Sequence, residues 1–473
     1  MSFDIYDVVI VGAGPVGLAT ALGLRKRGIE NILVLDQTRA FRQVGQVLDL
    51  LPNGLKSLKY IDTDAYAAVK NAAFDFFNSQ QLISQEKKTP QWSFKNLQGE
   101  TIRSISLSFD EWLQDYGEGR VSIPWYVLQT TLRQQLPEDR VKANHRCIHV
   151  VDEPENECVR IDCVSDTSIA ANPYAYWNEE KGQNSENVSP QTVTKSFRAK
   201  LIVAADGINS TMRRVIYQDS PYQDFAQPEY SGYAAISCRQ IVDIPHELQV
   251  EIADKFLQNS PIITICHDES SKNSVGDVED TRMMLFRNAS GEYGYLIHLA
   301  VSLASLQNQS GNSLIEIALQ ALEKAGFANA LKQLVHLSPP HNMQQRPYYI
   351  HRVNIADDES QQIQPPWSVG RVVLAGDAAH GMPPFMAQGA NQGLEDAIAL
   401  VTVIAKIAKE HNWDDKPAII RAFQKYESLR RPLMAYVQQA TLERYPYSSH
   451  QDWRHYSQQV YRRDFDQILA ALL

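Results

Sequence analysis

Residues 6–36 read YDVVIVGAGPVGLATALGLRKRGIENILVLD, and this stretch decides the fold of the chain. An apolar run from Val8 to Val11 leads into three glycines spaced Gly-x-Gly-x-x-Gly, followed by a helix-forming segment and a second apolar run. That run ends at Asp36, 19 residues after the last glycine, where a carboxylate can accept hydrogen bonds from ribose hydroxyls. This order of strand, glycine turn, helix, strand and acid predicts a βαβ unit that binds a dinucleotide.

The three glycines have separate physical roles in this prediction. Gly12 permits the tight turn, Gly14 lets the backbone approach a pyrophosphate, and Gly17 lets the helix pack closely on the strand. The helix N-terminus offers free N–H groups and the positive end of a dipole to the phosphates. We therefore assign Pro15 and Val16, which open this helix, to the same cofactor site.

A second segment decides which dinucleotide is bound. Residues 370–396 read GRVVLAGDAAHGMPPFMAQGANQGLED, a strand ending in Gly376-Asp377, a proline-containing loop and a glycine-rich entry to a helix. A carboxylate at a strand end can bind a polyol chain, and a helix N-terminus can face a carbonyl or phosphate. A flavin has both features, in its ribityl chain and its O2/N1 edge, so we assign Gly376 and Asp377 to FAD. The helix-entry residues assigned with them are Gly389, Ala390 and Asn391.

A third segment completes a set of motifs that resembles a known family. Residues 201–214 read LIVAADGINSTMRR, a short apolar strand that ends in Asp206-Gly207 before a helix opened by Ser210 and Arg213. With the glycine fingerprint, this Asp-Gly motif and the Gly-Asp motif in this order, the chain resembles the class A FAD-dependent monooxygenases. These form the aromatic-hydroxylase superfamily of p-hydroxybenzoate and salicylate hydroxylases. Further matching pieces are Arg42-x-x-Gly45 leading to Pro52-Asn53-Gly54, Tyr230-Ser231-Gly232-Tyr233, and Tyr426-x-x-x-Arg430-Arg431-Pro432.

The resemblance covers nearly the whole chain and implies an α/β fold of the p-hydroxybenzoate-hydroxylase type. Such a fold has a Rossmann-like FAD-binding domain, a β-sheet-rich substrate domain and C-terminal helices. Because the three motifs lie far apart in the sequence, the FAD-binding domain must be discontinuous. We expect that domain at 1–74, 118–216 and 345–400, the substrate domain at 75–117 and 217–344, and a C-terminal helical region at 401–473.

Residue patterns between the motifs indicate the remaining elements. Residues 229–244 and 281–302 are rich in β-branched and aromatic residues broken by turns, which predicts strands of a sheet laid over the flavin. Residues 313–335 have helical apolar spacing, and residues 451–473 are expected to form one more helix.

Residues 165–196 form a polar stretch rich in Asn, Ser, Gln and Thr, with two prolines. They interrupt an expected strand pairing between Cys158–Val164 and Phe197–Ala204. This composition predicts a mobile insertion at the tip of a hairpin.

The resemblance implies a monooxygenase reaction. In it, NAD(P)H reduces FAD, O₂ adds to give a flavin C4a-hydroperoxide, and its distal oxygen passes to an aromatic or other electron-rich small molecule. The sequence has a single Gly-x-Gly-x-x-Gly in strand–helix context, so NAD(P)H is expected as a transient co-substrate. Two alternatives remain open. One is another flavin chemistry on this scaffold (epoxidation, halogenation or reduction of an isoprenoid double bond), and the other is a flavin-binding protein without turnover.

The resemblance also suggests roles for single residues. Arg42 is expected to contact the FAD ribityl chain or phosphates, Asp206 to lie near the flavin, and Pro384 to line the active site. His380 follows two alanines in the Gly-Asp motif and is interpreted as structural rather than catalytic. Trp125 stands where many relatives carry an Arg or Gln that reaches FAD, which puts one phosphate contact in doubt.

The base that activates the substrate is not identified by any motif. Tyr233 on the expected substrate sheet is one candidate, and Gln46 and Asp49 on a strand facing the flavin in relatives are two others. Where salicylate-type enzymes continue this region with Trp-Arg, the chain has Ile236-Ser237, so salicylate is not the expected substrate.

Composition sets the remaining limits. The net charge is −10, without a basic block, which argues against nucleic-acid binding. The five cysteines are scattered with no Cys-x-x-Cys, so we expect reduced thiols in a cytoplasmic protein and no metal site. No uncharged apolar run reaches the ~18 residues that a membrane span requires. The expected partner is the aromatic small molecule that the resemblance implies, and a homodimer is left open.

Overall fold

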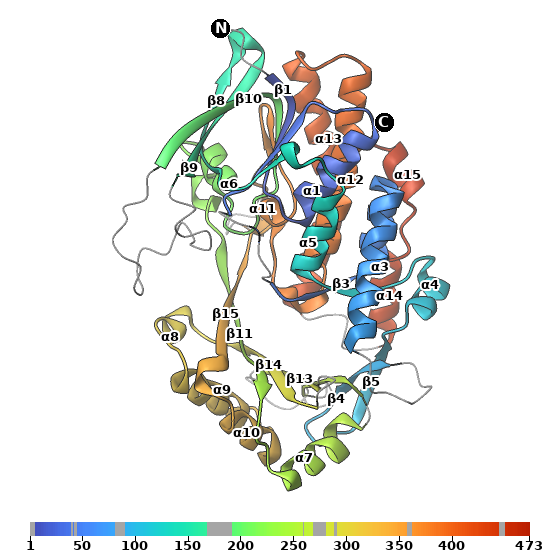
Figure 1. The fold of residues 1–473 in the computed structure, drawn as a ribbon, viewed down its shortest axis with the longest axis vertical. Coiled ribbons are helices and arrows are strands. Elements are labelled where there is room, and N and C mark those ends of the chain that lie inside the picture. The colour runs from blue at the N-terminus through green and yellow to red at the C-terminus, as the bar shows by residue number, and fades with distance from the viewer. Residues whose placement is uncertain are drawn as a thin grey trace. The chain divides into compact units, whose positions relative to one another are not determined.

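The computed structural model divides the chain into two compact units (Figure 1). It describes residues 5–38, 41, 45–80, 90–167, 192–258, 260–267, 281–287, 291–356, 362–443 and 450–473. Unit 1 comprises Met1–Asp75, Tyr116–Glu229 and Ile350–Leu473, and unit 2 comprises Phe76–Asp115 and Tyr230–Tyr349. Residues 401–473, which we expected to form a region of their own, group with unit 1.

Unit 1 is built on a sheet with the strand order β18-β19-β10-β1-β2-β7. Its strands are β1 (Ile5–Val11), β2 (Ile32–Leu35), β7 (Val141–Lys142), β10 (Thr192–Ala204), β18 (Ser368–Val369) and β19 (Val372–Leu374). From β19 to β7 all neighbours are parallel, and only β18 is antiparallel to β19. The chain first builds outward from β1 through β2 to β7 and then continues on the other side with β10 and β19. In such doubly wound sheets ligands bind beyond the carboxyl ends of the strands where the order reverses, here β1 and β10.

A hairpin extends one end of this sheet. It consists of β8 (Arg146–Glu153) and β9 (Cys158–Asp166), and β9 pairs antiparallel with the first half of β10, with Phe197 opposite Ile161. The predicted pairing is therefore confirmed. Most of the predicted insertion, residues 168–191, lies outside the described residues.

Helices flank the sheet of unit 1. They are α1 (Pro15–Lys26), α2 (Pro52–Ile61), α3 (Thr63–Gln80), α5 (Trp125–Gln134), α6 (Thr211–Tyr217), α11 (Asp377–His380), α12 (Gly389–Lys409), α13 (Lys416–Leu442), α14 (His450–Val460) and α15 (Phe465–Ala470). The buried helix α12 packs against α1, α2 and α13. Two small sheets pair β3 (Val47–Leu50) with β6 (Val121–Pro124) and β16 (Ile355–Ala356) with β17 (Gln362–Ile363).

The prediction of one final helix over 451–473 is wrong, because two helices occupy this segment. The side chain of Asp464 accepts a hydrogen bond from the Gln467 N–H at 3.1 Å and caps a new helix there. An aspartate at an N-cap satisfies an N–H group that the first turn of a helix leaves without a partner.

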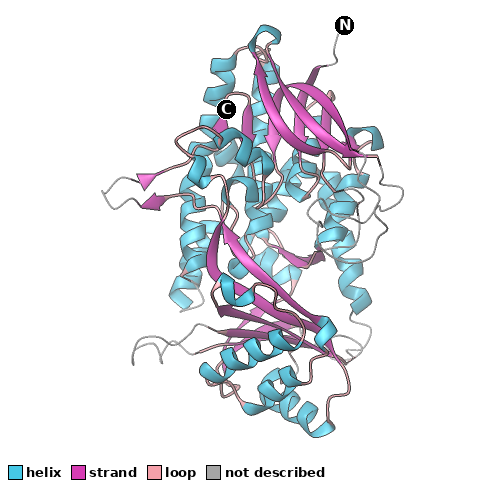
Figure 2. Ribbon diagram, turned by 90° about the vertical axis from the view of Figure 1, so that its left-hand side faces the viewer, coloured by secondary structure: helices cyan, strands magenta, loops and turns pink. Residues whose placement is uncertain are grey.

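Unit 2 is a sheet covered by helices (Figure 2). The strand order is β15-β11-β14-β13-β12-β4-β5. The strands are β4 (Gln91–Lys95), β5 (Thr101–Ser106), β11 (Glu229–Ile241), β12 (Ile262–Ile265), β13 (Arg282–Arg287), β14 (Tyr293–Ala300) and β15 (Met343–Ile350). The helices are α4 (Phe109–Tyr116), α7 (His246–Ile252), α8 (Leu303–Leu306), α9 (Asn312–Lys324) and α10 (Asn329–His336). Strands within 229–244 and 281–302 are thus confirmed.

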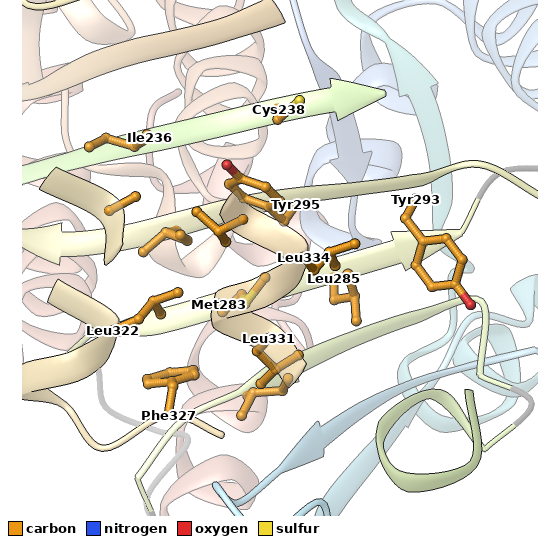
Figure 3. Packing of buried hydrophobic residues seen from close by; sticks show 14 of the residues in the cluster. Ile236, Cys238, Met283, Leu285, Tyr293, Tyr295, Leu322, Phe327, Leu331 and Leu334 are labelled. Carbon is orange, nitrogen blue, oxygen red and sulfur yellow. The ribbon is translucent and has the colours of Figure 1, made fainter. Parts of the chain in front are cut away.

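The core of unit 2 lies between the sheet and α9 and α10. Leu322 and Leu334 project from these helices toward Met283 and Leu285 on β13 (Figure 3). The predicted helical segment 313–335 is two helices rather than one, because Gly326 adopts a φ of +73° and breaks it.

Candidate functional site

A cavity of about 230 Å³ lies at the carboxyl ends of β1 and β10, where the strand order predicts a ligand. We call it the β1–β10 cavity. Four residues that the sequence assigned to the cofactor line it together: Gly12, Gly14, Asp36 and Asp206. The lining residues that sequence reasoning missed include Gln129, His145 and Cys147. Gln129 lies on α5, His145 comes directly before β8 and Cys147 lies on β8, and no motif marks them.

The three glycines of the fingerprint differ in what surrounds them. Gly12 has a φ of +104°, and a Cβ there would lie 2.3 Å from the Ala205 carbonyl oxygen. A Cβ on Gly17 would lie 2.0 Å from the Gly12 oxygen. At Gly14, by contrast, the nearest atom among the described residues is Trp125 Cζ2 at 3.9 Å. The fold itself therefore needs glycine at positions 12 and 17, whereas at position 14 glycine keeps a wall of the cavity open.

The Asp36 carboxylate is held in place by backbone amides. Its Oδ2 accepts the Ala13 N–H at 2.6 Å and its Oδ1 accepts the Thr38 N–H at 2.7 Å. Gln129 Nε2 donates to the Ala13 carbonyl at 2.7 Å and fixes the same turn from α5. Because each carboxylate oxygen has two lone pairs, Asp36 keeps acceptor capacity for hydroxyl groups in the cavity.

The Asp206 carboxylate organises the start of α6. Its oxygens accept hydrogen bonds from Ser210 Oγ at 2.5 Å, the Thr211 N–H at 2.7 Å and the Met212 N–H at 3.1 Å. Burial raises the pKa of Asp206, and these hydrogen bonds oppose that shift. Asp206 therefore both lines the cavity and builds the local turn.

Arg213 joins the Asp-Gly and Gly-Asp segments. This buried guanidinium donates through Nη1 to the carbonyls of Ala378 and Ala379, both at 3.0 Å, and through Nε to the Phe225 carbonyl at 2.9 Å. Two motifs that are 165 residues apart in the sequence are thereby locked together.

Val16 provides a second link between the motifs. A Cβ on Gly376 would lie 3.1 Å from Val16 Cγ2, and a Cβ on Gly393 would lie 2.4 Å from the same atom. Val16 therefore packs against these two glycines, one at the N-cap of α11 and one in α12. Pro15 is buried at the first position of α1, where its lack of an N–H has no cost.

Asp377 lies beside the start of α12, in the arrangement of carboxylate and helix end that the sequence predicted. Asp377 is exposed, and its Oδ1 lies 3.6 Å from the position that a Cβ on Gly389 would take. Gly389 and Ala390 in this first turn are half-buried. The first N–H groups of a helix have no partner within it, so this end suits a polar ligand edge.

The side chain of Asn391 is used within the protein. Its Oδ1 accepts the Leu51 N–H at 2.8 Å, and its Nδ2 donates to the carbonyls of Asp49 at 2.9 Å and Ala387 at 2.6 Å. These hydrogen bonds connect the segment between β3 and α2 to the first turn of α12. A contact of Asn391 with a cofactor would therefore have to come from its backbone.

A buried network of charged side chains contacts the Gly-Asp segment. The Oδ2 atom of Asp396 lies 2.5 Å from His380 Nε2, and its Oδ1 atom lies 2.8 Å from Arg430 Nε. Arg430 also forms an ion pair with Glu395, with Nη1 at 2.6 Å from Oε2. Burial by itself would raise the pKa of Asp396, but His380 and Arg430 outweigh it and hold that pKa at about 2. Asp396 also accepts the Gly376 N–H at 2.8 Å. His380 thus has the surroundings of a structural residue, as interpreted from the sequence.

Sequence reasoning missed this network, although a signal was present. Glu395 and Asp396 are the only charged residues in the helix sequence from Gly389 through Ala405. Charged side chains on such a helix need buried partners.

The candidate bases have different surroundings. Asp49 forms an ion pair with Arg120 and accepts Ser122 Oγ at 2.6 Å, so its carboxylate is already engaged with a cation. Gln46 is half-buried, and its backbone carbonyl accepts the Trp125 N–H at 3.0 Å. The ion pair and the Ser122 hydroxyl hold this carboxylate within the protein, so its geometry favours a structural role over that of a general base.

The two residues proposed for catalysis lie in different units. Tyr233 is half-buried on β11 in unit 2, opposite Ala300 of β14. Pro384 is half-buried in unit 1 and begins the short 3₁₀ turn Pro384–Met386. Arg42, which was assigned to the cofactor, lies outside the described residues.

In the part of the chain that the structure describes, no group of three or more His, Cys, Asp or Glu side chains is placed to hold a metal ion. Within the same residues, no helix has the length and apolar composition that crossing a membrane requires.

Known proteins resemble this chain along most of its length. The model of the FAD binding domain family matches residues 5–47 and 328–441. An FAD-dependent monooxygenase of Aspergillus terreus is 23% identical over 90% of this chain and 83% of its own, and salicylate hydroxylase of Pseudomonas putida is 24% identical over 92% and 84%. The solved structure of a salicylate hydroxylase substrate complex superimposes with a TM-score of 0.65 at 17% identity, covering 99% of this chain and 98% of that one. This similarity confirms the predicted fold class.

Proposed function

The chain belongs to the FAD-dependent monooxygenases of the aromatic-hydroxylase superfamily, and we propose that it hydroxylates an aromatic or other electron-rich small molecule. FAD is its cofactor. NAD(P)H as the reductant and O₂ as the oxygen source belong to the same proposal. A cytoplasmic location and a homodimer remain predictions.

The observation that carries the proposal is the open wall at Gly14 in the β1–β10 cavity. A Cβ fits at this position as far as the described residues are concerned, so the glycine is explained by a ligand that needs the space. The same cavity presents the fixed Asp36 carboxylate, which suits ribose hydroxyls, and lies at the N-terminus of α1, which suits a pyrophosphate.

The Gly-Asp segment would hold the flavin half of the cofactor. Asp377 is proposed to accept hydrogen bonds from the ribityl hydroxyls, and the amides of Gly389 and Ala390 to face the flavin edge. The contacts of Arg213 and Val16 hold this segment next to the elements that form the β1–β10 cavity, so one extended molecule can reach both.

Bound FAD would supply the redox chemistry, namely acceptance of a hydride from NAD(P)H and activation of O₂ for transfer of one oxygen atom. The residues of this chain bind and orient the cofactor and exclude water. Pro384 is proposed to line the reaction site and Tyr233 to contact the substrate. The salicylate hydroxylase of Pseudomonas putida supports a hydroxylated aromatic acid as the first substrate class to test.

Substrate-gated reduction tests this proposal. In anaerobic stopped-flow experiments, the FAD-loaded protein should be reduced slowly by NADH or NADPH alone. With a compound that it hydroxylates, reduction should be faster by orders of magnitude, because substrate binding favours the closed, reactive state. Under air the same compound should gain one oxygen atom, detected by mass spectrometry. If no phenol or hydroxybenzoate in a panel changes NAD(P)H oxidation or gains oxygen, hydroxylation is excluded for that panel and a flavin-binding protein without turnover becomes the better description.

Replacing Asp377 tests the flavin half of the site. Asp377→Ala should raise the Kd for FAD by about 10–150-fold, since charge-assisted hydrogen bonds contribute about 1.5–3 kcal/mol. The Kd is measured by titrating apoprotein and following flavin fluorescence. Asp464→Ala is the matched control, because it removes an aspartate that caps α15 at a distance from the Gly-Asp motif in the sequence. An unchanged Kd in Asp377→Ala would remove this residue from the site.

A further inference from the structure

Two buried cysteines face each other on adjacent strands of unit 1. Cys147 on β8 is directly opposite Cys163 on β9, and their sulfur atoms are 3.2 Å apart. Both thiols are free. Opposite residues of an antiparallel pair have Cα atoms about 4.5–5.5 Å apart, which is within the range of disulfides. Forming a bond requires the sulfurs to approach by about 1.2 Å, to about 2.05 Å, with the strands kept in register.

The two thiols differ in their access to the β1–β10 cavity. Cys147 is 4% exposed and lines the cavity, whereas Cys163 has no exposed surface. The cavity reaches the surface at the exposed residue Gln37, which also lines it. A small oxidant that enters the cavity therefore reaches Cys147 before Cys163.

We propose that Cys147 and Cys163 are a peroxide-oxidisable dithiol, and that the nucleotide half of FAD shields it by filling the β1–β10 cavity. The shielding rests on the proposed position of FAD, whereas the dithiol itself rests on the strand geometry alone. The oxidant is hydrogen peroxide. It converts the Cys147 thiol to a sulfenic acid with loss of one water, and the Cys163 thiol then displaces a second water to form the disulfide. Two thiols and one peroxide thus give one disulfide and two waters.

The surroundings of Cys147 set the expected rate. The neighbouring Cys163 thiol and burial raise the pKa of Cys147 well above its ordinary value, and the carboxylates of Asp36 and Asp206 act in the same direction. Since the thiolate is the reactive form, oxidation at neutral pH is slow and is followed over hours. Slow oxidation also makes any shielding easy to measure.

The experiment compares apoprotein with FAD-loaded protein during incubation with millimolar hydrogen peroxide. Samples are quenched and denatured, free thiols are counted, and linked peptides are identified by mass spectrometry. The apoprotein should yield a Cys147–Cys163 peptide pair, which dithiothreitol separates. The half-buried Cys266 is oxidised independently, so the linked peptide and not the total thiol count is the readout. With FAD at a hundred times its Kd, only about 1% of the protein is unliganded, so the rate should fall at least about tenfold. AMP, which carries only the nucleotide end, should protect as FAD does.

Variants identify the pair. Cys147→Ser and Cys163→Ser should each abolish the linked peptide, while Cys238→Ser, a buried cysteine of β11 in unit 2, should form it at the wild-type rate. Wild-type apoprotein that forms no linked peptide overturns the dithiol. Equal rates with and without bound FAD overturn the shielding. A protein that binds no FAD and still forms the link would contradict the proposed cofactor site while supporting the dithiol.

Discussion

Gly14→Ala is expected to raise the Kd for FAD by about 5–150-fold while leaving the melting temperature of the apoprotein nearly unchanged. The added methyl group meets only Trp125 at 3.9 Å among the described residues, and the backbone at position 14 (φ −77°, ψ 176°) is one that alanine adopts readily. The same methyl group occupies the wall that the pyrophosphate must approach. Overfilling a packed site costs about 1–3 kcal/mol, which corresponds to this range of affinity. Flavin fluorescence and thermal unfolding of the apoprotein measure the two quantities.

Gly12→Ala is the control that separates folding from binding. Its Cβ would lie 2.3 Å from the Ala205 carbonyl oxygen, and its φ of +104° is unfavourable for any L-residue. We expect this variant to lose several degrees of melting temperature and FAD binding together. If Gly14→Ala showed the same joint loss, the open wall at position 14 would belong to the fold and not to a ligand.

Arg430→Met is expected to destabilise the protein by about 3–5 kcal/mol. The substitution takes the Arg430 guanidinium away from both Glu395 and Asp396, which keep Arg463 at 3.4 Å and His380 at 2.5 Å. Removing one partner of a buried ion pair is strongly destabilising. Arg352→Met is the matched control, because its ion pair with Glu229 is solvent-exposed and such pairs contribute about 0–1 kcal/mol. Urea unfolding measures both. Equal effects of the two substitutions would show that the buried network contributes little to stability.

The pH dependence of stability gives an independent readout of the same network. The pKa of Asp396 is about 2 in the folded protein, below the value of about 3.9 expected in the unfolded chain. Its contribution to stability is therefore present above about pH 4 and is lost as the pH falls toward 2. In Arg430→Met one of the two groups that lower this pKa is absent, so the loss of stability between about pH 4 and pH 2 should be smaller than in the wild type. Parallel pH profiles for wild type and Arg430→Met would contradict the assignment.

The elements that could be predicted are those marked by local patterns. Three such elements are the strand Ile32–Leu35, the helix that begins at Pro15 and the helix that begins at Gly389. They could be predicted because backbone geometry at a glycine turn or a helix start depends on neighbouring residues. The same locality explains the one error. Asp464 caps a new helix inside 451–473, where a single helix was predicted, and Gly326 likewise separates two helices within the predicted helical segment 313–335.

The candidate site was predictable only in part. The residues of the three motifs were found, because each motif combines a residue type with a fixed spacing in the sequence. The contacts that each side chain makes could not be predicted. Asp206 is bonded to its own turn, and Val16 packs against Gly376 and Gly393. Which partner a side chain meets depends on which distant segment packs beside it, and spacing does not encode that.

The sequence by itself determined the class of fold and of cofactor, since glycine turns, strand ends and helix starts are local features with local physical causes. The tertiary structure alone decided three further matters: the partners of Asn391, which reaches Leu51 across 340 residues of sequence; the ion network around Asp396; and the meeting of Cys147 with Cys163 beside the cavity. Each of these depends on burial, which forces polar groups to find partners wherever the packed chain brings them, however far apart they are in the sequence.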